Sequence, residues 1–274
     1  MSINVGYHSI CWGGVVGEPV GVTSIKDLFY LSNGDLERAL SDIAASGYQG
    51  FEVFDGNLAA YSDDLPRIRD VIRDTGLTPI GVYSGANFIF DEILDEELWR
   101  IEKSAALAAE IGAPHLVIGG GAQRSTGIED SDYPKLGRAL DRVVSIARSH
   151  GLDCVFHPHL TTIVESPDQI ARVLSESEIG LCVDTAHVAA GGGDPAEVIR
   201  AHSDRLGYVH LKDLIPDPFS FQPLGRGELD LAGVVEALRD VDYDGWLTVE
   251  LDSYDGDPRE AAEASRRFLA DLGI

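Results

Sequence analysis

Histidine and acidic side chains stand at the ends of four short apolar segments in the second half of the sequence. The four residues are His157, Asp184, His210 and Glu250. Neighbouring parallel strands lie about 4.8 Å apart, so side chains from the ends of four such strands can converge on one cation. Imidazole and carboxylate together suit Mn²⁺, Co²⁺, Zn²⁺ or Fe²⁺ better than Ca²⁺. The sequence therefore predicts a divalent-metal site, with Mn²⁺ as the first choice and Co²⁺, Mg²⁺, Zn²⁺ or Fe²⁺ as alternatives.

Each member of this set also has a plainer explanation. A single histidine in a strand is more often a hydrogen-bonded core residue than a metal ligand, and Asp184 could simply cap a loop. Glu52 and Glu250 are harder to explain in that way, because each lies between apolar neighbours. A buried carboxylate is unfavourable unless it is paired or bound to metal. The prediction of a metal site therefore rests on the convergence of the whole set.

The segments that must position these residues alternate between strand and helix patterns. Eight runs rich in β-branched and aromatic residues are expected to be strands: Ile3–Ser9, Gly50–Phe54, Thr78–Tyr83, His115–Gly119, Cys154–His157, Gly180–Asp184, Gly207–Leu211 and Trp246–Leu251. The amphipathic stretches beside them are expected to be helices: Asp35–Ser46, Asp63–Thr75, Asp95–Ile111, Tyr133–His150, Pro167–Ser175, Asp194–Ser203, Leu231–Asp240 and Pro258–Leu272. Eight strand–helix units predict a closed (β/α)8 TIM barrel that forms a single domain over residues 1–274. An open doubly wound sheet would explain only five or six of the units comfortably.

Long connections follow several of the expected strands. They are Ile10–Asn33, Ser84–Leu94, Gly120–Asp132 and Lys212–Asp230. Active sites of such barrels lie at the C-terminal ends of the strands, so the extra length falls where a substrate pocket would be. Gly119–Gly120–Gly121 lacks the spacing of a dinucleotide-binding loop and is expected to be a flexible loop. The aromatic residues Trp12 and Phe219–Phe221 on these connections would stack on a sugar face or anchor their loops.

The charge of the chain excludes several classes of partner. The 46 acidic and 21 basic residues give a net charge of −25 and a pI of about 4.4. Such a surface repels phosphate backbones and anionic lipids, so we expect neither nucleic-acid nor membrane binding. Three scattered cysteines, Cys11, Cys154 and Cys182, indicate a reducing compartment. With no visible signal peptide and no long apolar run, a cytoplasmic location is expected.

Motifs in the second half of the chain resemble a known family. The stretches HPHLTTIVES, LCVDTAH and YVHLKDL, followed by GRGELDL and YDGWLTVELD, are similar to the sugar phosphate isomerase/epimerase-like family of the xylose isomerase-like TIM barrel superfamily, in particular to its inosose dehydratase-like members. Asp184 and His187 match the family's D-x-x-H, and His210 and Lys212 match its H-x-K. Glu250 matches the glutamate that closes the metal site. The resemblance implies a metal-dependent enzyme that acts on a small sugar or polyol.

One departure from the family pattern bears on the reaction. Many isomerases and epimerases of this superfamily have a metal-binding glutamate where this chain has His157. An epimerase needs a base on each face of its substrate, whereas a β-elimination needs one base and one acid. We therefore expect a metal-dependent carbon–oxygen, or carbon–carbon, lyase that works through an enediolate on a neutral keto-polyol or keto-sugar, such as an inosose or a 3-keto-glycoside.

Two other functional hypotheses for the same residues stay open. The first is an isomerase or epimerase with the same metal-enediolate chemistry, for which Glu165 is a nearby carboxylate. The second is a non-catalytic sugar-binding barrel. The DNA-repair branch of endonuclease-IV type is disfavoured by the charge and by Glu52 and Tyr83, which stand where that branch has further histidines. A homo-oligomer or a second subunit is compatible with the sequence.

The sequence offers candidates for each role in a lyase. The candidate bases are His157, His159 and Glu52, and the candidate acids are Lys212 and His187. Residues expected to contact substrate are His8, Trp12, Glu165 and Phe219. Lys212 is one of only four lysines, and a lysine among carboxylates should remain protonated. Its alternative role is a simple ion pair with Asp213 or Glu250.

Overall fold

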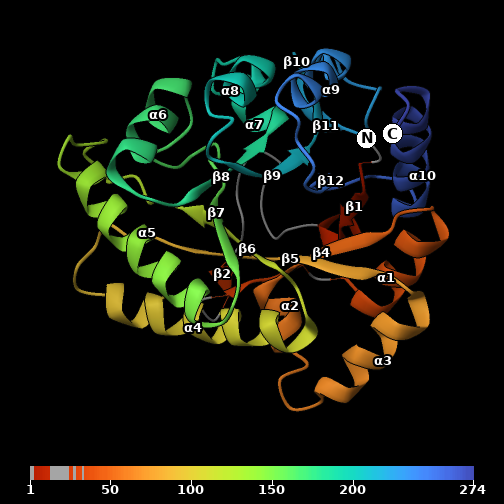
Figure 1. The fold of residues 1–274 in the computed structure, drawn as a ribbon, viewed down its shortest axis with the longest axis horizontal. Helices are drawn as coiled ribbons and strands as arrows, with labels where there is room; N and C mark the ends of the chain where they lie inside the picture. Colours follow the sequence, from red (N-terminus) through yellow and green to blue (C-terminus); the bar gives the residue numbers. More distant parts are fainter. Residues whose placement is uncertain (1–2, 13–24, 27–28, 33) are drawn as a thin grey trace.

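Eight parallel strands close into a barrel in the computed structural model, which describes residues 3–12, 25–26, 29–32 and 34–274 (Figure 1). The barrel strands are β1 (Val5–His8), β4 (Gly50–Phe54), β5 (Thr78–Ala86), β6 (His115–Gly120), β7 (Asp153–Phe156), β8 (Gly180–Asp184), β9 (Leu206–Leu211) and β12 (Leu247–Val249). They pair in the order β1-β12-β9-β8-β7-β6-β5-β4, and β4 closes the ring on β1. The expected (β/α)8 barrel and its eight strands are confirmed.

Helices surround the strands. The outer ring consists of α1 (Leu36–Ala45), α3 (Leu65–Thr75), α4 (Leu94–Ile111), α5 (Asp132–Ser149), α6 (Pro167–Glu176), α8 (Pro195–Ala201), α9 (Leu231–Asp240) and α10 (Pro258–Asp271). Their ends follow local rules: Ser166 and Gln169 form a capping box at the start of α6. Gly112 ends α4 in the left-handed conformation, with φ 80°. None of the described helices combines the length and the apolar character needed to cross a bilayer.

Short additional elements follow several strands at the C-terminal end of the barrel, and the sequence patterns did not predict them. They are the 3-10 helix η1 (Ser9–Trp12), β2 (Ile25–Lys26), β3 (Phe29–Tyr30), α2 (Asp55–Ala59), α7 (Thr185–Ala190), β10 (Asp213–Pro216) and β11 (Phe219–Gln222). The expected loop after β9 thus contains an antiparallel hairpin, β10–β11. Most of the expected connection Ile10–Asn33 lies outside the described residues.

The expectation of a flexible loop at Gly119–Gly121 is wrong for its first two residues, which belong to β6. A side chain is excluded there by close packing: a Cβ on Gly119 would lie 1.8 Å from the hydroxyl of Tyr83, and one on Gly120 would lie 2.1 Å from the carbonyl oxygen of Ala86. Several strand ends also differ from expectation, and two of these differences concern the polar residues of the site. β7 ends at Phe156 and β12 ends at Val249, so His157 and Glu250 each begin the connection that follows.

The alternation of strand side chains explains how the barrel presents its polar residues. Val155, Cys182, Tyr208 and Thr248 are buried inside the barrel. Successive side chains on a strand point to opposite faces, so the next inward position comes two residues later, at the C-terminal mouth. Those positions hold His157, Asp184, His210 and Glu250. A layer of uncharged side chains therefore lies beneath the layer of histidines and carboxylates.

Candidate metal and substrate site

Four side chains from neighbouring strands meet at the barrel mouth. Ligand atoms of His157, Asp184, His210 and Glu250 all lie within 4.8 Å of one another. The Nε2 of His157 lies 3.5 Å from Oδ2 of Asp184, and the Nδ1 of His210 lies 2.5 Å from Oε2 of Glu250. The register explains this arrangement, because Asp184 pairs with His210 and His210 pairs with Thr248, two residues before Glu250.

Unpartnered polar atoms at the centre of this cluster fit a cation. No described residue gives a hydrogen bond to Oδ2 of Asp184 or shares one with either ring nitrogen of His157, although all three atoms are buried. Buried polar groups are nearly always satisfied, and two imidazoles with two carboxylates form a common donor set for divalent transition metals. Cys182 also lies close to His157 and His210. Burial raises the pKa of its thiol well above the usual value, which favours the protonated form.

His210 lies between two carboxylates. Its Nε2 lies 2.8 Å from Oε2 of Glu52, which is fully buried. Burial disfavours the charged form of His210, but Glu52 and Glu250 outweigh it and raise the pKa to about 10. Burial also opposes ionisation of Glu52, yet the charge of His210 outweighs it and holds the Glu52 pKa below its usual value. Glu52 therefore fixes the orientation of the His210 ring, as partners of metal-binding histidines commonly do.

Lys212 is fully buried in a cage of carboxylates. Its Nζ lies 2.8 Å from Oε1 of Glu250, 2.6 Å from Oδ1 of Asp252 and 3.7 Å from Oδ2 of Asp184. Burial disfavours the ammonium ion, but these carboxylates outweigh it and raise the Lys212 pKa. Of the two pairings expected from sequence, the one with Glu250 is present. Asp213 instead accepts hydrogen bonds from backbone N–H groups, and these bonds hold the chain that returns from the hairpin.

Two further histidines lie beside Lys212. The rings of His159 and His187 are 3.9 Å apart between centroids, and Nε2 of His187 lies 3.4 Å from Nζ of Lys212. Burial, followed by the nearby His157, lowers the pKa of His159 to about 4. Burial and His159 lower the His187 pKa well below its usual value. Both imidazoles are therefore neutral at pH 7.

The residues expected to contact substrate are dispersed. His8 lies in the mouth, with Nε2 3.7 Å from Oε1 of Glu52. Phe219 is half-buried and packs against Phe221 at 5.2 Å. Trp12 donates from its indole nitrogen to Asp42 of α1 at 2.9 Å, which is an anchoring contact.

Glu165 is engaged in the turn that follows β7. Its carboxylate accepts a hydrogen bond from the backbone N–H of Thr161. His8 therefore lies at the cluster, whereas Trp12 anchors η1 to α1 and Glu165 holds the turn after β7.

Sequence reasoning missed three residues of the mouth. Asp252 contacts Lys212 as described, and its only signal was its place two residues after Glu250. Tyr83 packs edge-on against His157 at 5.4 Å, and Phe54 packs against His8 at 4.7 Å. Both aromatic residues stand near the ends of barrel strands, and this position was the available signal.

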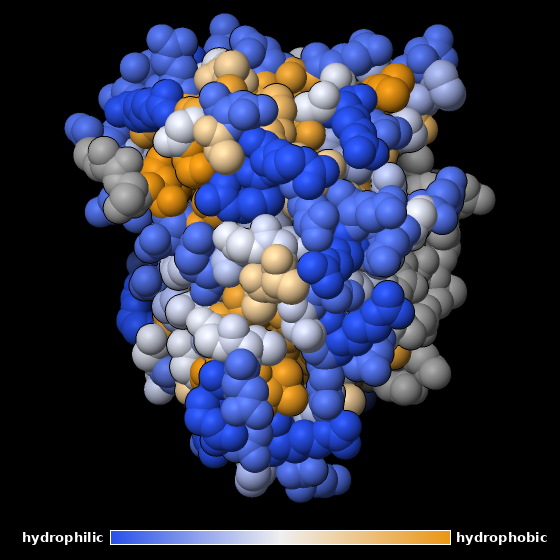
Figure 2. All heavy atoms as spheres, turned by 90° about the vertical axis from the view of Figure 1, so that its right-hand side faces the viewer, coloured by the Kyte–Doolittle hydropathy of each residue, from blue (hydrophilic) through white to orange (hydrophobic). Residues whose placement is uncertain are grey.

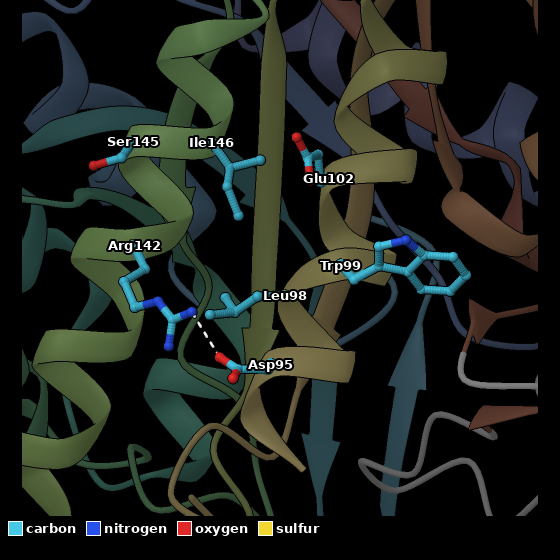
Figure 3. A pocket seen from close by; sticks show the side chains of 7 residues that line it. All are labelled: Asp95, Leu98, Trp99, Glu102, Arg142, Ser145 and Ile146. Atoms are coloured by element: carbon cyan, nitrogen blue, oxygen red, sulfur yellow. Dashed lines mark hydrogen bonds and ion pairs between the residues drawn. The ribbon is translucent and has the colours of Figure 1, made fainter.

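A cavity of about 480 Å³ lies between α4 and α5 on the outer ring of helices (Figure 3). An ion pair of 2.8 Å between Arg142 and Asp95 crosses it, and Trp99 at its edge is 55% exposed. Its lining contains neither histidine nor cysteine. The buried cluster at the barrel mouth is therefore the candidate site.

A family profile described as "Xylose isomerase-like TIM barrel" matches residues 40–272. The chain belongs to this family. Its curated relatives include the inosose dehydratase of Geobacillus kaustophilus, which is 28% identical over 250 residues that cover 78% of this chain and 79% of the relative.

Two solved structures share the fold at lower identity. The 3-keto-D-glucoside 4-epimerase of E. coli has a TM-score of 0.73 and 20% identity, and the alignment covers 99% of both chains. The probable 3-DHS dehydratase of Bacillus anthracis has a TM-score of 0.76 and 13% identity, over 98% of this chain and 99% of that one. Proteins that share this fold are thus named for both epimerisation and dehydration.

Proposed function

We propose that this protein is a divalent-metal-dependent lyase that removes water, or another β-leaving group, from a neutral keto-polyol or keto-sugar. The observation that carries the proposal is the buried cluster of His157, Asp184, His210 and Glu250 beside Lys212. The relatives named inosose dehydratase support an enzyme that modifies sugars or polyols by elimination. His157, in the place of a second glutamate, favours elimination over two-base epimerisation.

The charges of the mouth support a bound cation. Four buried carboxyl groups, Glu52, Asp184, Glu250 and Asp252, face two groups that carry positive charge, Lys212 and protonated His210. Burial raises the pKa of Asp252 to about 7, so the negative charge rests on Glu52, Asp184 and Glu250, which still outnumber the two positive groups. The proposed ligands are His157, Asp184, His210 and Glu250, with Mn²⁺ as the first choice. When bound, the metal supplies Lewis-acid polarisation of the substrate carbonyl and the neighbouring hydroxyl. His210 would give up its proton to bind it.

The remaining polar residues supply one acid and one base. Lys212 stays protonated among its carboxylates and is the proposed acid: its Nζ would give a proton to the departing hydroxyl, which leaves as water. His159 is neutral, and its Nδ1 lies 2.7 Å from the carbonyl oxygen of Leu160. A proton on Nδ1 would leave Nε2 free to accept the proton from the substrate carbon. The carbon–hydrogen electron pair then forms the double bond as the carbon–oxygen bond breaks.

The proposal assigns Glu52 to orienting His210 and leaves His157 as a ligand. His187 lies between His159 and Lys212 and would position both. The test is turnover of an inosose and of a 3-keto-glycoside by protein stripped with a chelator and then reloaded with Mn²⁺. Metal-dependent formation of an enone or diketone supports the lyase. Metal-dependent incorporation of deuterium from heavy water without elimination would instead identify an epimerase.

A further inference from the structure

We propose that a groove beside the reaction centre binds a second ring of the substrate, so that a keto-glycoside is preferred over a monocyclic keto-polyol. The inference rests on the proposed function and narrows its substrate class. The groove has a volume of about 260 Å³ and lies between β11 and the segment that follows β12. Its lining residues are Phe219, Ser220, Phe221, Gln222, Ser253, Tyr254 and Asp255.

The groove adjoins the proposed acid. The ring centroid of Phe221 lies 4.5 Å from Nζ of Lys212 and 5.4 Å from the ring of His187. On the other side of the mouth, Asp252 contacts Lys212 and directly precedes the groove residue Ser253. Phe221 therefore borders both Lys212 and the groove. The proposal places a substituent on the leaving oxygen of the substrate in this groove, beside Phe221.

The lining combines aromatic and polar groups. Phe219 and Tyr254 are partly exposed and offer ring faces, while Ser220, Gln222 and Asp255 offer hydrogen-bonding groups. A sugar ring has an apolar face of C–H groups and an edge of hydroxyls, so it suits aromatic contacts with a few polar groups around them. At about 260 Å³ the groove is smaller than most pockets for drug-sized ligands, which span roughly 300–1,000 Å³, and its size suits a single ring.

Both walls of the groove are held in place. The hydroxyl of Tyr254 accepts a hydrogen bond from Arg226 at 3.1 Å. The carboxylate of Asp213 accepts backbone N–H groups of Gly225 and Gly227 at 3.0 Å, which ties the chain after the hairpin to the base of β10. A wall that is ordered before binding loses less conformational entropy when the ring binds.

The test compares two substrates in three variants. Tyr254→Ala should lower kcat/KM for a phenyl 3-keto-glucoside about tenfold, mainly through KM, and leave kcat/KM for a monocyclic inosose unchanged. Tyr254→Phe keeps the ring and should retain most activity on the glycoside. Trp99→Ala, on the outer helix ring, should leave kcat/KM for both substrates unchanged. Equal losses on both substrates, or no loss on the glycoside, would overturn the subsite.

A binding measurement separates failure of this inference from failure of the proposed function. Unreactive phenyl β-glucoside should bind the wild-type protein and bind Tyr254→Ala about tenfold more weakly in calorimetry. That result would retain the groove even if neither ketone were turned over. Equal binding to both proteins would refute the groove even if elimination were observed.

A second inference rests on a different observation, the distribution of charge over the surface. Of the 44 acidic residues whose side chains are described, eight are buried, which leaves 36 at least partly exposed. The corresponding number of basic residues is 18. Arginine outnumbers lysine by 17 to four. The face shown in Figure 2 is covered mainly by hydrophilic side chains with small apolar spots.

From this imbalance we infer that the native state is adapted to a high concentration of monovalent salt. Unpaired like charges repel one another in the compact state and destabilise it. The Debye length falls from about 10 Å at 0.1 M to about 3 Å at 1 M salt, so concentrated salt suppresses this repulsion. The unfolded chain spreads the same charges over a larger volume and gains less from screening.

Thermal unfolding in increasing KCl tests this inference. The unfolding midpoint should rise by roughly 10 °C between 0.1 and 2 M KCl. Replacing three exposed helix glutamates together (Glu102→Gln, Glu176→Gln and Glu236→Gln) should raise the midpoint at 0.1 M and reduce its dependence on salt. The matched Glu→Asp variant at the same positions keeps the charge and should behave as wild type. A midpoint that is flat or falls with KCl would contradict the inference.

Discussion

Replacing Glu52 distinguishes two candidate roles of its carboxylate: orienting His210 and acting as the general base. Its carboxylate lies 2.8 Å from Nε2 of His210 and is fully buried, so the structure supports an orienting role. Partners of metal-binding histidines typically contribute 10- to 100-fold to metal affinity. Glu52→Gln keeps an acceptor for His210 but removes the charge, so we expect Mn²⁺ affinity to fall about tenfold. Glu52→Ala removes both, and the expected loss is about 100-fold, or roughly 2.7 kcal/mol.

The assay is calorimetric titration of chelator-treated protein with Mn²⁺. Glu97→Gln is a matched control, because Glu97 is a buried carboxylate that accepts hydrogen bonds from Asn87 and from the backbone N–H of Phe88, away from the cluster. It should lower thermal stability and leave Mn²⁺ affinity unchanged. If Glu52→Gln bound Mn²⁺ as tightly as wild type but lost turnover, the orienting role would be wrong and the role of base would fit instead.

Three further predictions concern the acid, the packing and the pH response. Lys212→Met should bind one Mn²⁺ and lose at least 100-fold in kcat for elimination; retention of kcat would remove Lys212 from the acid role. Gly137→Ala should lower the free energy of unfolding by about 1–3 kcal/mol, because a Cβ there would lie 2.4 Å from the carbonyl oxygen of Glu176. Mn²⁺ affinity should not change. Unaltered stability in urea would contradict this prediction, because it would show that α5 and α6 move apart without a cost in free energy. Burial raises the pKa of Asp55 to about 6, so the folded state holds this proton more tightly than the unfolded chain. The contribution of Asp55 to stability should therefore decline by roughly 2–3 kcal/mol as the pH rises from 4 to 7, and a pH-independent difference between wild type and Asp55→Asn would contradict this.

Periodicity predicted the barrel because each unit repeats the same local rules. Amphipathic stretches marked the helices, and runs rich in β-branched and aromatic residues marked the strands. The alternation of side chains then placed Asp184, His210 and Glu250 at one end of the barrel. These inferences need only the period of each element and the parallel order of the strands.

Features that depend on tertiary contacts could not be read in the same way. The hairpin β10–β11 depends on Asp213, whose carboxylate collects N–H groups from residues up to Leu229. The cage around Lys212 depends on Asp252, which lies in an irregular segment after β12. Glu52 and His210 are 158 residues apart in the chain, so the sequence does not show that Glu52 contacts Nε2 of His210.

The most direct test of the metal-dependent mechanism combines metal content with turnover in the wild type and in His210→Ala. We predict one divalent ion per chain in the wild type, loss of elimination after chelation and its recovery on adding Mn²⁺. His210→Ala should fold, bind Mn²⁺ at least 100-fold more weakly and show no turnover at the Mn²⁺ concentration that saturates the wild type. Full elimination activity in metal-free wild-type protein, or a normal metal content in His210→Ala, would contradict the proposed site.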